Sequence, residues 1–427
     1  MIIPCRTLPF TNLPKSQSPF SPPKKAKASA FPPRIASETY FPKDQARACE
    51  EAIVKMTFTD PAVHLSKKES LLSHSATVCP KENGVLIILH SPHKIGSGSF
   101  KQVKLCMNTA TRALLKRSTI ILDESDPSYS SKKRAYEAES RVAALVPTVR
   151  DCVVPTYLIF RRVVQRQEKS ILKIEIFQPY HDACLFGVIN LLTFPNMLRV
   201  AKDVAKAIKW FHERNLEHRD VKPENVFVNY NQKTGALTEV VLGDYDLVVE
   251  KNTPACLRVS GSCFYMAPEL HQFAIAKSIF SNQEAWIPRL GTGVDIWSFG
   301  CLLATVALKG LPPWTHHLRA PEQLDLAHCG AIAMLGEMSV YSAAPESEGN
   351  LLGYPVKGVP QPFLTAIKAC LCFEPTVRPS INQVIELIER AAPSKLNERA
   401  LAEISTPSPK KLMTSTSHLL DGAKDEN

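Results

Sequence analysis

The hydrophobic pattern of the chain changes near Asp182, and this change constrains the fold more than any other feature. Upstream lie four apolar segments that are typical of strands: "GVLIILH", "QVKLCMN", "ALLKRSTIIL" and "ILKIEIFQ". They are interrupted by one segment of helical periodicity, "KKRAYEAESRVAALV". Downstream, helical periodicity dominates, as in "MLRVAKDVAKAIKWFHERN" and "INQVIELIERAA". This order predicts an α+β fold in two lobes, a small β-rich lobe at about 86–178 and a larger helical lobe at about 181–392.

Both ends of the chain differ in composition from this central part. Residues 1–42 hold nine prolines together with many Ser and Lys, so we expect a disordered Pro/Ser-rich tail. Residues 43–85 contain a helix-like patch but no clear tertiary signal, and we interpret them as a linker of uncertain structure. Residues 393–427 again have a disorder-like composition. The N-terminal tail could regulate, dock or act as a non-classical export signal, and composition does not choose among these roles.

Charge and cysteine usage exclude several classes of protein. The net charge is +10, but residues 1–85 carry 12 Lys/Arg against 7 Asp/Glu and the rest carry 39 against 34. This excess is diffuse, so we expect no nucleic-acid partner. The twelve cysteines form no CxxC pair, which argues against a zinc site or a disulfide framework and predicts a reducing, cytoplasmic compartment. The most apolar run, 296–308, is too short to span a bilayer, so we expect no membrane insertion.

The residues that carry chemistry occur in separate short segments. "HRDVKPEN" crowds charged side chains and an amide into eight residues, and "VVLGDYDL" places Asp244 at the end of an apolar strand. Two oxygen ligands, Asn225 and Asp244, suit Mg²⁺. Upstream, "IGSGSFKQV" offers Gly96 and Gly98, where backbone amides can approach phosphate oxygens. Taken singly, each segment also fits an ordinary turn, strand edge or solvated loop.

In combination and order, these segments resemble the eukaryotic-type protein kinase family over roughly 88–392, with "GSCFYMAPE", "DIWSFG" and "FEPTVRPS" completing the series. The resemblance implies a protein-kinase-like fold and transfer of phosphate from ATP, with Mg²⁺, to hydroxyls of a protein substrate. Asp220 would be the catalytic base and Lys222 would neutralise the transferred group. Asn225 and Asp244 would hold the metal, and Lys116 would grip the phosphates while paired with Glu139.

The same resemblance implies an adenine site and several structural contacts. The ATP-binding set would include residues of the glycine loop and of the hinge between the lobes, namely Ile95, Gly96, Gly98, Val103, Gln178 and Tyr180. Phe177 would form the back wall, and Tyr180 would supply the hinge amide because Pro179 has none. Glu269 and Arg378 would form a buried ion pair, Asp295 would brace the catalytic loop, and Ser262 would contact Asp220 and Lys222.

Three residues depart from the family pattern. Lys101 replaces the third glycine of the loop, Tyr245 replaces Phe, and Asp246 replaces the glycine of Asp-Phe-Gly. We expect an active serine/threonine-protein kinase, because every group that would touch phosphate or metal is retained. The alternative is a pseudokinase that binds nucleotide or acts as a scaffold, and Lys101 and Asp246 are its support.

The resemblance implies an activation segment between Asp244 and Glu269, and this segment lacks a familiar feature. In many family members a phosphorylated threonine binds the arginine that corresponds to Arg219. That threonine stands three residues before the glycine that corresponds to Gly261, and here the position holds Arg258. We therefore expect the usual phosphorylation switch to be absent. Thr253 and Ser260 are the nearest hydroxyls.

Overall fold

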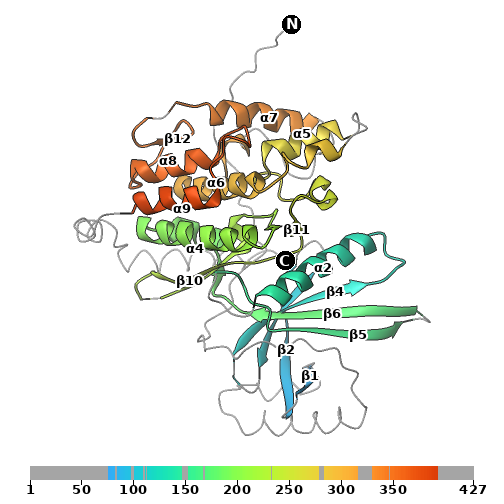
Figure 1. The fold of residues 1–427 in the computed structure, drawn as a ribbon. Coiled ribbons are helices and arrows are strands. Elements are labelled where there is room, and N and C mark those ends of the chain that lie inside the picture. The colour runs from blue at the N-terminus through green and yellow to red at the C-terminus, as the bar shows by residue number, and fades with distance from the viewer. Residues whose placement is uncertain are drawn as a thin grey trace, which may run out of the picture.

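The computed structural model describes residues 76–81, 84–97, 101–108, 111, 113–146, 152–166, 169–231, 233–277, 283–315, 329–345 and 347–392. The predicted tails 1–42 and 393–427 lie outside these residues, as does most of the predicted linker. Figure 1 shows two lobes, a twisted sheet accompanied by helix α2 and a stack of helices beside it. This arrangement confirms the predicted bilobal α+β fold.

The small lobe is a six-stranded antiparallel sheet in the order β1-β2-β3-β4-β6-β5. Its strands are β1 (Ala76–Lys81), β2 (Gly84–Ser97), β3 (Gln102–Asn108), β4 (Leu114–Leu122), β5 (Leu158–Arg166) and β6 (Lys169–Pro179). Helix α2 (Tyr129–Leu145) lies across the sheet and buries Ala135, Ala138 and Val142. Alternation along β4 places Leu115 in the interior, because successive side chains of a strand point to opposite faces.

Two strands of this sheet were not predicted. β1 begins at Ala76, inside the predicted linker, and pairs with β2 from Ala76↔Leu89 to Lys81↔Gly84. β5 is an edge strand, and Val163 is 65% exposed on it. An edge strand with one solvated face carries no continuous apolar run, so "LIFRRVVQR" gives a weak strand signal.

The large lobe is built on helix α6 (Gly293–Leu308), which is apolar on all sides and therefore occupies the centre. Around it lie α3 (Leu185–Val188), α4 (Phe194–His212), α5 (Pro268–Ala276), α7 (Cys329–Ser342), α8 (Gln361–Cys370) and α9 (Ile381–Arg390). Helix α9 begins with a capping box, in which Ser380 and Gln383 satisfy each other's backbone amides. One extensive hydrophobic core joins these helices.

Short strands lie between the six-stranded sheet and the helices of the large lobe. β7 (Ala183–Cys184), β9 (Val226–Tyr230) and β10 (Leu237–Leu242) form one small sheet, and β8 (Leu216–Glu217) pairs with β11 (Val249–Glu250) in another. A distant pair, β12 (Asn350–Leu351) and β13 (Tyr354–Pro355), precedes α8. The first two sheets fix the ends of the loops that carry the candidate site.

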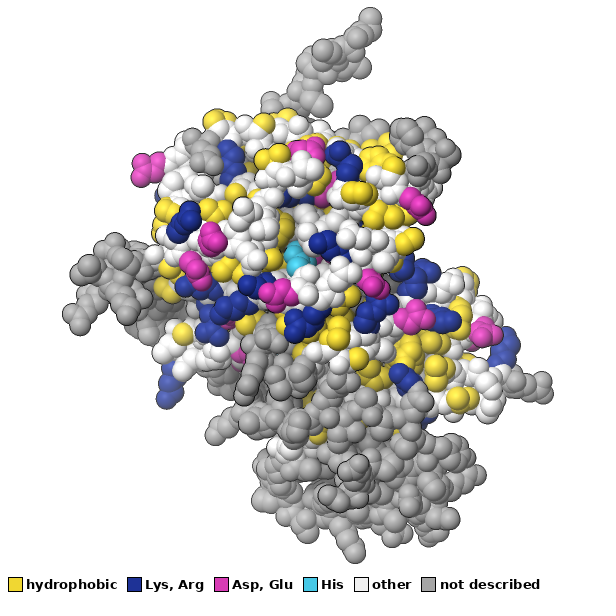
Figure 2. Space-filling model, in the orientation of Figure 1, with side chains coloured by type: hydrophobic (Ala, Val, Ile, Leu, Met, Phe, Trp, Pro, Cys, Tyr) yellow, Lys and Arg dark blue, Asp and Glu magenta, His cyan; other side chains and the backbone are white. Residues whose placement is uncertain are grey.

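No helix in the described part of the chain combines the length and the apolar character needed to cross a membrane. Eight cysteines whose side chains the structure describes are free thiols: Cys106, Cys152, Cys184, Cys256, Cys263, Cys301, Cys370 and Cys372. On the coloured part of the face in Figure 2, basic and acidic side chains are interspersed.

Close packing of α6 on α8 requires glycine at position 300. A Cβ added to Gly300 would lie 2.7 Å from Cβ of Cys370 and 2.9 Å from Cδ2 of Leu371. We predict that Gly300→Ala destabilises the protein by about 1–3 kcal/mol, because the two helices must separate. The midpoint of urea unfolding measures this effect.

Gly336→Ala is the matched control, since Gly336 lies in α7 with no atom within 4 Å of its added Cβ. We expect this control to stabilise by about 0.5–1 kcal/mol, because alanine has the higher helix propensity. An unchanged midpoint for Gly300→Ala would contradict the described α6–α8 contact.

Candidate active site

The segment that carries Asp220 is held by a buried carboxylate of the large lobe. Asp295, in the first turn of α6, accepts hydrogen bonds from the amides of His218 and Arg219, both at 2.8 Å. Arg219 adopts a left-handed backbone conformation with φ of 69°. This geometry is costly for a non-glycine residue, and Asp295 stabilises it. The predicted bracing role of Asp295 is confirmed.

Asp220 is the centre of a compact polar network. Lys222 Nζ lies 2.7 Å from its Oδ2, and Asn225 Nδ2 donates to the same oxygen at 2.8 Å. The hydroxyl and the amide of Ser262 donate to Oδ1 at 2.9 and 3.0 Å. The predicted contacts of Ser262 with Asp220 and Lys222 are confirmed, the latter at 2.5 Å. Burial opposes the charge of Lys222, but Asp220 outweighs it and raises the pKa of Lys222.

Asp244 follows β10 and lies beside the segment that carries Asp220. The amide of Gly243 donates to the carbonyl oxygen of Asn225 at 2.9 Å, which joins the two segments directly. Asp244 has φ of 65°, a conformation that turns its side chain out of the strand direction. Because Asn225 uses its NH₂ group on Asp220, its amide oxygen is the atom left for another partner. An amide oxygen and a carboxylate are a donor set that fits Mg²⁺.

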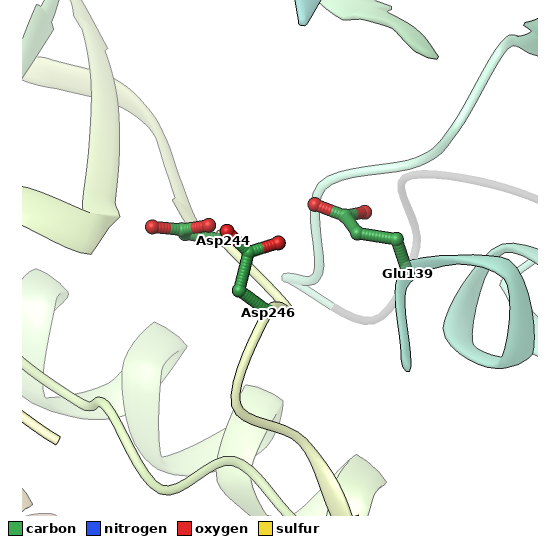
Figure 3. Close-up of side chains that lie close together, drawn as sticks. All are labelled: Glu139, Asp244 and Asp246. Atoms are coloured by element: carbon green, nitrogen blue, oxygen red, sulfur yellow. The ribbon is translucent and has the colours of Figure 1, made fainter. Parts of the chain in front are cut away.

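Glu139 of α2 pairs with Lys101 and not, as the sequence led us to expect, with Lys116. Nζ of Lys101 lies 2.5 Å from Oε1 of Glu139 and 3.1 Å from Oδ1 of Asp244. It also lies 2.5 Å from Oδ1 of Asp246. Figure 3 shows the three carboxylates converging, two from the loop after β10 and one from α2. The Lys101 ammonium lies among these acidic groups.

Asp246 fits its position without backbone strain. It is not among the described residues with positive φ, so the glycine usual at this position is not required here. Its carboxylate is turned toward Lys101. Burial raises the pKa of Asp246 to about 7, although Lys101 opposes this shift.

Tyr245 fills the position that is Phe in the family pattern. It is fully buried, and its hydroxyl donates to the carbonyl oxygens of Val154 and Leu242 at 2.6 and 3.1 Å. Its ring contacts Phe211 and His218. The additional hydroxyl is therefore satisfied, and Tyr245 anchors the segment next to Asp244.

The hinge departs from the prediction in one respect. Phe177 is fully buried among Leu115, Leu158 and other residues, as a back wall should be. The amide of Tyr180, however, donates to the carbonyl oxygen of Leu114 at 3.2 Å. Binding of adenine through this amide would require that hydrogen bond to break. Gln178 is buried, and its side chain contacts Thr156.

The predicted glycine-loop residues are only partly described. The backbones of Ile95 and Gly96 belong to β2, and Gly96 pairs with Val103 of β3. Gly98 lies outside the described residues. Their predicted contact with ATP stays a prediction.

Lys116 lies next to the hinge between the lobes. Its Cα is paired with that of Gln178, and its ammonium lies 3.9 Å from the centroid of the Phe227 ring. Burial lowers the pKa of Lys116 from 10.5 to about 8, although Asp244 and Glu139 oppose this shift. The charged form of Lys116 is therefore less favoured in the folded protein than in the unfolded chain.

Two structural contacts of the activation segment bear on the predicted switch. Arg378 forms a bidentate ion pair with Glu269 at 2.6 and 2.7 Å, which confirms the predicted pair. Arg219 donates to Oε2 of Glu217 at 2.9 Å and to the carbonyl oxygen of Cys256 at 2.8 Å. Glu217 is fully buried, whereas Arg258 is exposed. The guanidinium of Arg219 thus already has a carboxylate partner.

Sequence reasoning missed two site residues, Lys101 and Glu217. The signal for Lys101 was present, because it stands where the family pattern has a small glycine and a buried ammonium needs anionic partners. Glu217 lies two residues before Arg219, and the short strand β8 gives no local sign that both side chains turn to the same interior.

The low pKa of Lys116 predicts a pH dependence of stability. The unfolded chain binds a proton to Lys116 up to about pH 10.5, whereas the folded chain loses it near pH 8. Stability should therefore rise with pH across this window relative to Lys116→Met, by on the order of 1 kcal/mol between about pH 7.5 and 9.5. Thermal unfolding of both proteins across this range measures the difference.

The exposed Lys357 provides the control Lys357→Met, which should not change the pH dependence. A stability difference between wild type and Lys116→Met that does not vary with pH would contradict the described environment of Lys116.

Comparison with known proteins agrees with this geometry. The sequence model of the family described as "Protein kinase domain" matches residues 89–387. MAP kinase-interacting serine/threonine-protein kinase 1 of Xenopus tropicalis is 31% identical over 125 residues, which cover 27% of this chain and 27% of the relative. Mitogen-activated protein kinase kinase kinase 5 of Arabidopsis thaliana is 26% identical over 304 residues, 68% of this chain and 35% of the relative.

A third relative, the probable serine/threonine-protein kinase fhkD of Dictyostelium discoideum, is 26% identical over 226 residues, 52% of this chain and 28% of the relative. The match thus spans about a quarter to a third of the length of these three relatives. The family match covers well over half of the chain and includes every segment of the candidate site. The chain belongs to the protein kinase family.

Proposed function

We propose that the protein transfers the γ-phosphoryl group of ATP to serine or threonine hydroxyls of protein substrates. The observation that carries this proposal is the network around Asp220, in which Lys222, Asn225 and Ser262 all contact its carboxylate. A carboxylate held from three sides is preorganised to accept a proton from a hydroxyl that binds beside it.

The other residues have roles that follow from charge. The ammonium of Lys222, next to Asp220, would offset negative charge on the transferred group. Asn225 and Asp244 would hold Mg²⁺, which supplies neutralisation of phosphate charge when it is bound. The contact of Lys222 with Ser262 supports the serine/threonine class, because the resemblance implies this pair for that branch of the family.

The alternative, a pseudokinase that binds nucleotide or acts as a scaffold, is supported by a different contact. The hinge amide of Tyr180 is engaged by Leu114, and the side chain of Lys116 lies beside Phe227. Both features reduce the space and the donors available to an adenine ring. Turnover of ATP decides between the two functions.

For either function we expect a reducing, cytoplasmic compartment, because the twelve cysteines of the sequence form no CxxC pair.

Asp220→Asn and Asp244→Asn should each lower phosphorylation of a generic basic-protein substrate by at least about 10²-fold, because each removes a charge that acts in the transition state. Circular dichroism should be unchanged, since asparagine keeps the size of either side chain. Incorporation of labelled phosphate by the full-length protein with ATP and Mg²⁺ measures the effect. Wild-type rates in either variant, or an inactive wild type, would contradict the proposal.

The contacts of Arg219 predict a kinase that does not need phosphorylation of its activation segment. Activity should survive phosphatase treatment and the double change Thr253→Ala with Ser260→Ala. Glu217→Gln should lower activity by at least about tenfold, because it leaves a buried guanidinium without its counter-charge.

Kinase assays on these variants, with folding followed by circular dichroism, provide the test. Loss of activity on phosphatase treatment, with Glu217→Gln still active, would assign the switch to loop phosphorylation instead.

A further inference from the structure

We propose that Lys101 is the lysine that binds the phosphates of ATP, and that Lys116, the lysine expected from the sequence, does not. This inference rests on the proposed function and identifies the residue that provides one of its essential charges. It would assign a role in ATP binding to the residue that directly precedes β3.

The first argument is position. Lys101 directly precedes β3 (Gln102–Asn108), and its Nζ reaches both Glu139 of α2 and Asp244. Asp244 is the predicted metal ligand, so the phosphates that share this metal must lie next to it. An ammonium 3.1 Å from Oδ1 of Asp244 is therefore within reach of those phosphates.

Lys116 lies in a different position, beside the hinge. Strand β4 pairs Lys116 with Gln178 and Leu115 with Pro179, so Lys116 is next to the hinge. Its ammonium lies over the ring of Phe227, on β9. Within the described part of the chain, no ion pair joins Lys116 to a carboxylate. Two residues further along β4, about 7 Å away on the same face, stands Ser118. Ser118 is buried and carries only a hydroxyl, so it offers no cation to the phosphates.

The surroundings of the two lysines differ in the same direction. Three carboxylates, those of Glu139, Asp244 and Asp246, lie within 3.1 Å of the Lys101 ammonium. The ammonium of Lys116 lies over the ring of Phe227 instead. Lys101 is therefore the lysine held beside the predicted metal ligand, where the phosphates would bind.

Asp246 completes the description. Lys101 carries one positive charge and contacts three carboxylates. Its ammonium can therefore exchange one carboxylate contact for a phosphate oxygen while Glu139 still holds it in place. A phosphate oxygen would compete with Asp246 for the same ammonium. Two of the departures from the family pattern, Lys101 and Asp246, are thus partners in one ion pair.

The most direct experiment labels the lysine nearest to the phosphates. An acyl-phosphate derivative of ATP positions an activated acyl carbon at the end of the phosphate chain. A neighbouring lysine amine attacks this carbon, the acyl–phosphate bond breaks, ATP leaves with the bonding electrons, and the ammonium proton passes to water. Mass spectrometry of the full-length protein should find the acyl group on Lys101, and excess ATP should suppress it. Labelling of Lys116 alone, or of neither lysine, would overturn the inference.

Kinetics of matched variants provide the second test. Lys101→Met should lower kcat/KM for ATP by about 10²–10³-fold, the range expected for loss of one transition-state cation or donor. Lys116→Met makes the same chemical change at the other buried lysine. Its kcat/KM for ATP should stay within about tenfold of the wild-type value, a limit equal to about 1.4 kcal/mol. The reverse order of effects would restore Lys116 as the phosphate-binding lysine.

The two tests separate this inference from the proposed function. Labelling of Lys101 in a wild-type protein that transfers no phosphate would reject the kinase activity and leave the assignment of Lys101 intact. An active wild type whose Lys101→Met variant is equally active would reject the assignment and leave the proposed function intact.

Discussion

The buried carboxylate of Asp295 is the interaction on which the active-site geometry depends. It lies in the first turn of α6, the central helix of the large lobe, where the positive end of the helix dipole favours a negative charge. Burial opposes its ionisation, but a contact with His212 at 3.0 Å and the amides of the catalytic loop outweigh this and lower the pKa of Asp295. The segment that carries Asp220 is thereby attached to α6, in which almost every residue is buried.

The consequences extend from this attachment to the activation segment. The loop turns at Arg219 with a positive φ, and the Arg219 side chain then reaches Glu217, Cys256 and Leu290. A Cβ on Gly261 would lie 2.9 Å from the carbonyl oxygen of Arg219, so the activation segment can approach this closely only through glycine. Ser262 follows immediately and contacts Asp220. The position of Asp220 is therefore determined by two contacts: Asp295 of α6 holds the preceding backbone, and Ser262 of the activation segment binds its carboxylate.

The sequence was most informative where chemistry and spacing lie within one short segment. Asp220, Lys222 and Asn225 belong to a single turn-containing loop, so their spacing nearly determines their geometry, and the structure brings them together as predicted. Contacts between distant segments, such as Glu269 with Arg378, were predicted only through the family resemblance. The edge strand β5 and the early strand β1 were missed because a solvated or short strand has little hydrophobic pattern.

The pairing of Glu139 could not be predicted from spacing, and the reason is the geometry of strands. A strand advances about 3.3 Å per residue and alternates its faces, so a lysine displaced by two positions moves about 7 Å without changing the face on which it lies. The apolar pattern of β4 is the same whether Lys116 lies next to Glu139 or two residues closer to the hinge. Only the pairing of Lys116 with Gln178 shows that it lies at the hinge.

What selects Lys101 is a balance of charge among segments that are far apart in the sequence. Glu139 comes from α2, Asp244 and Asp246 come from the loop after β10, and the three carboxylates converge on one small volume. Three carboxylates this close together repel one another, and a cation placed among them offsets this repulsion. Lys101 is the ammonium that the fold brings into this volume, and no single segment of the sequence contains the information that it is needed there.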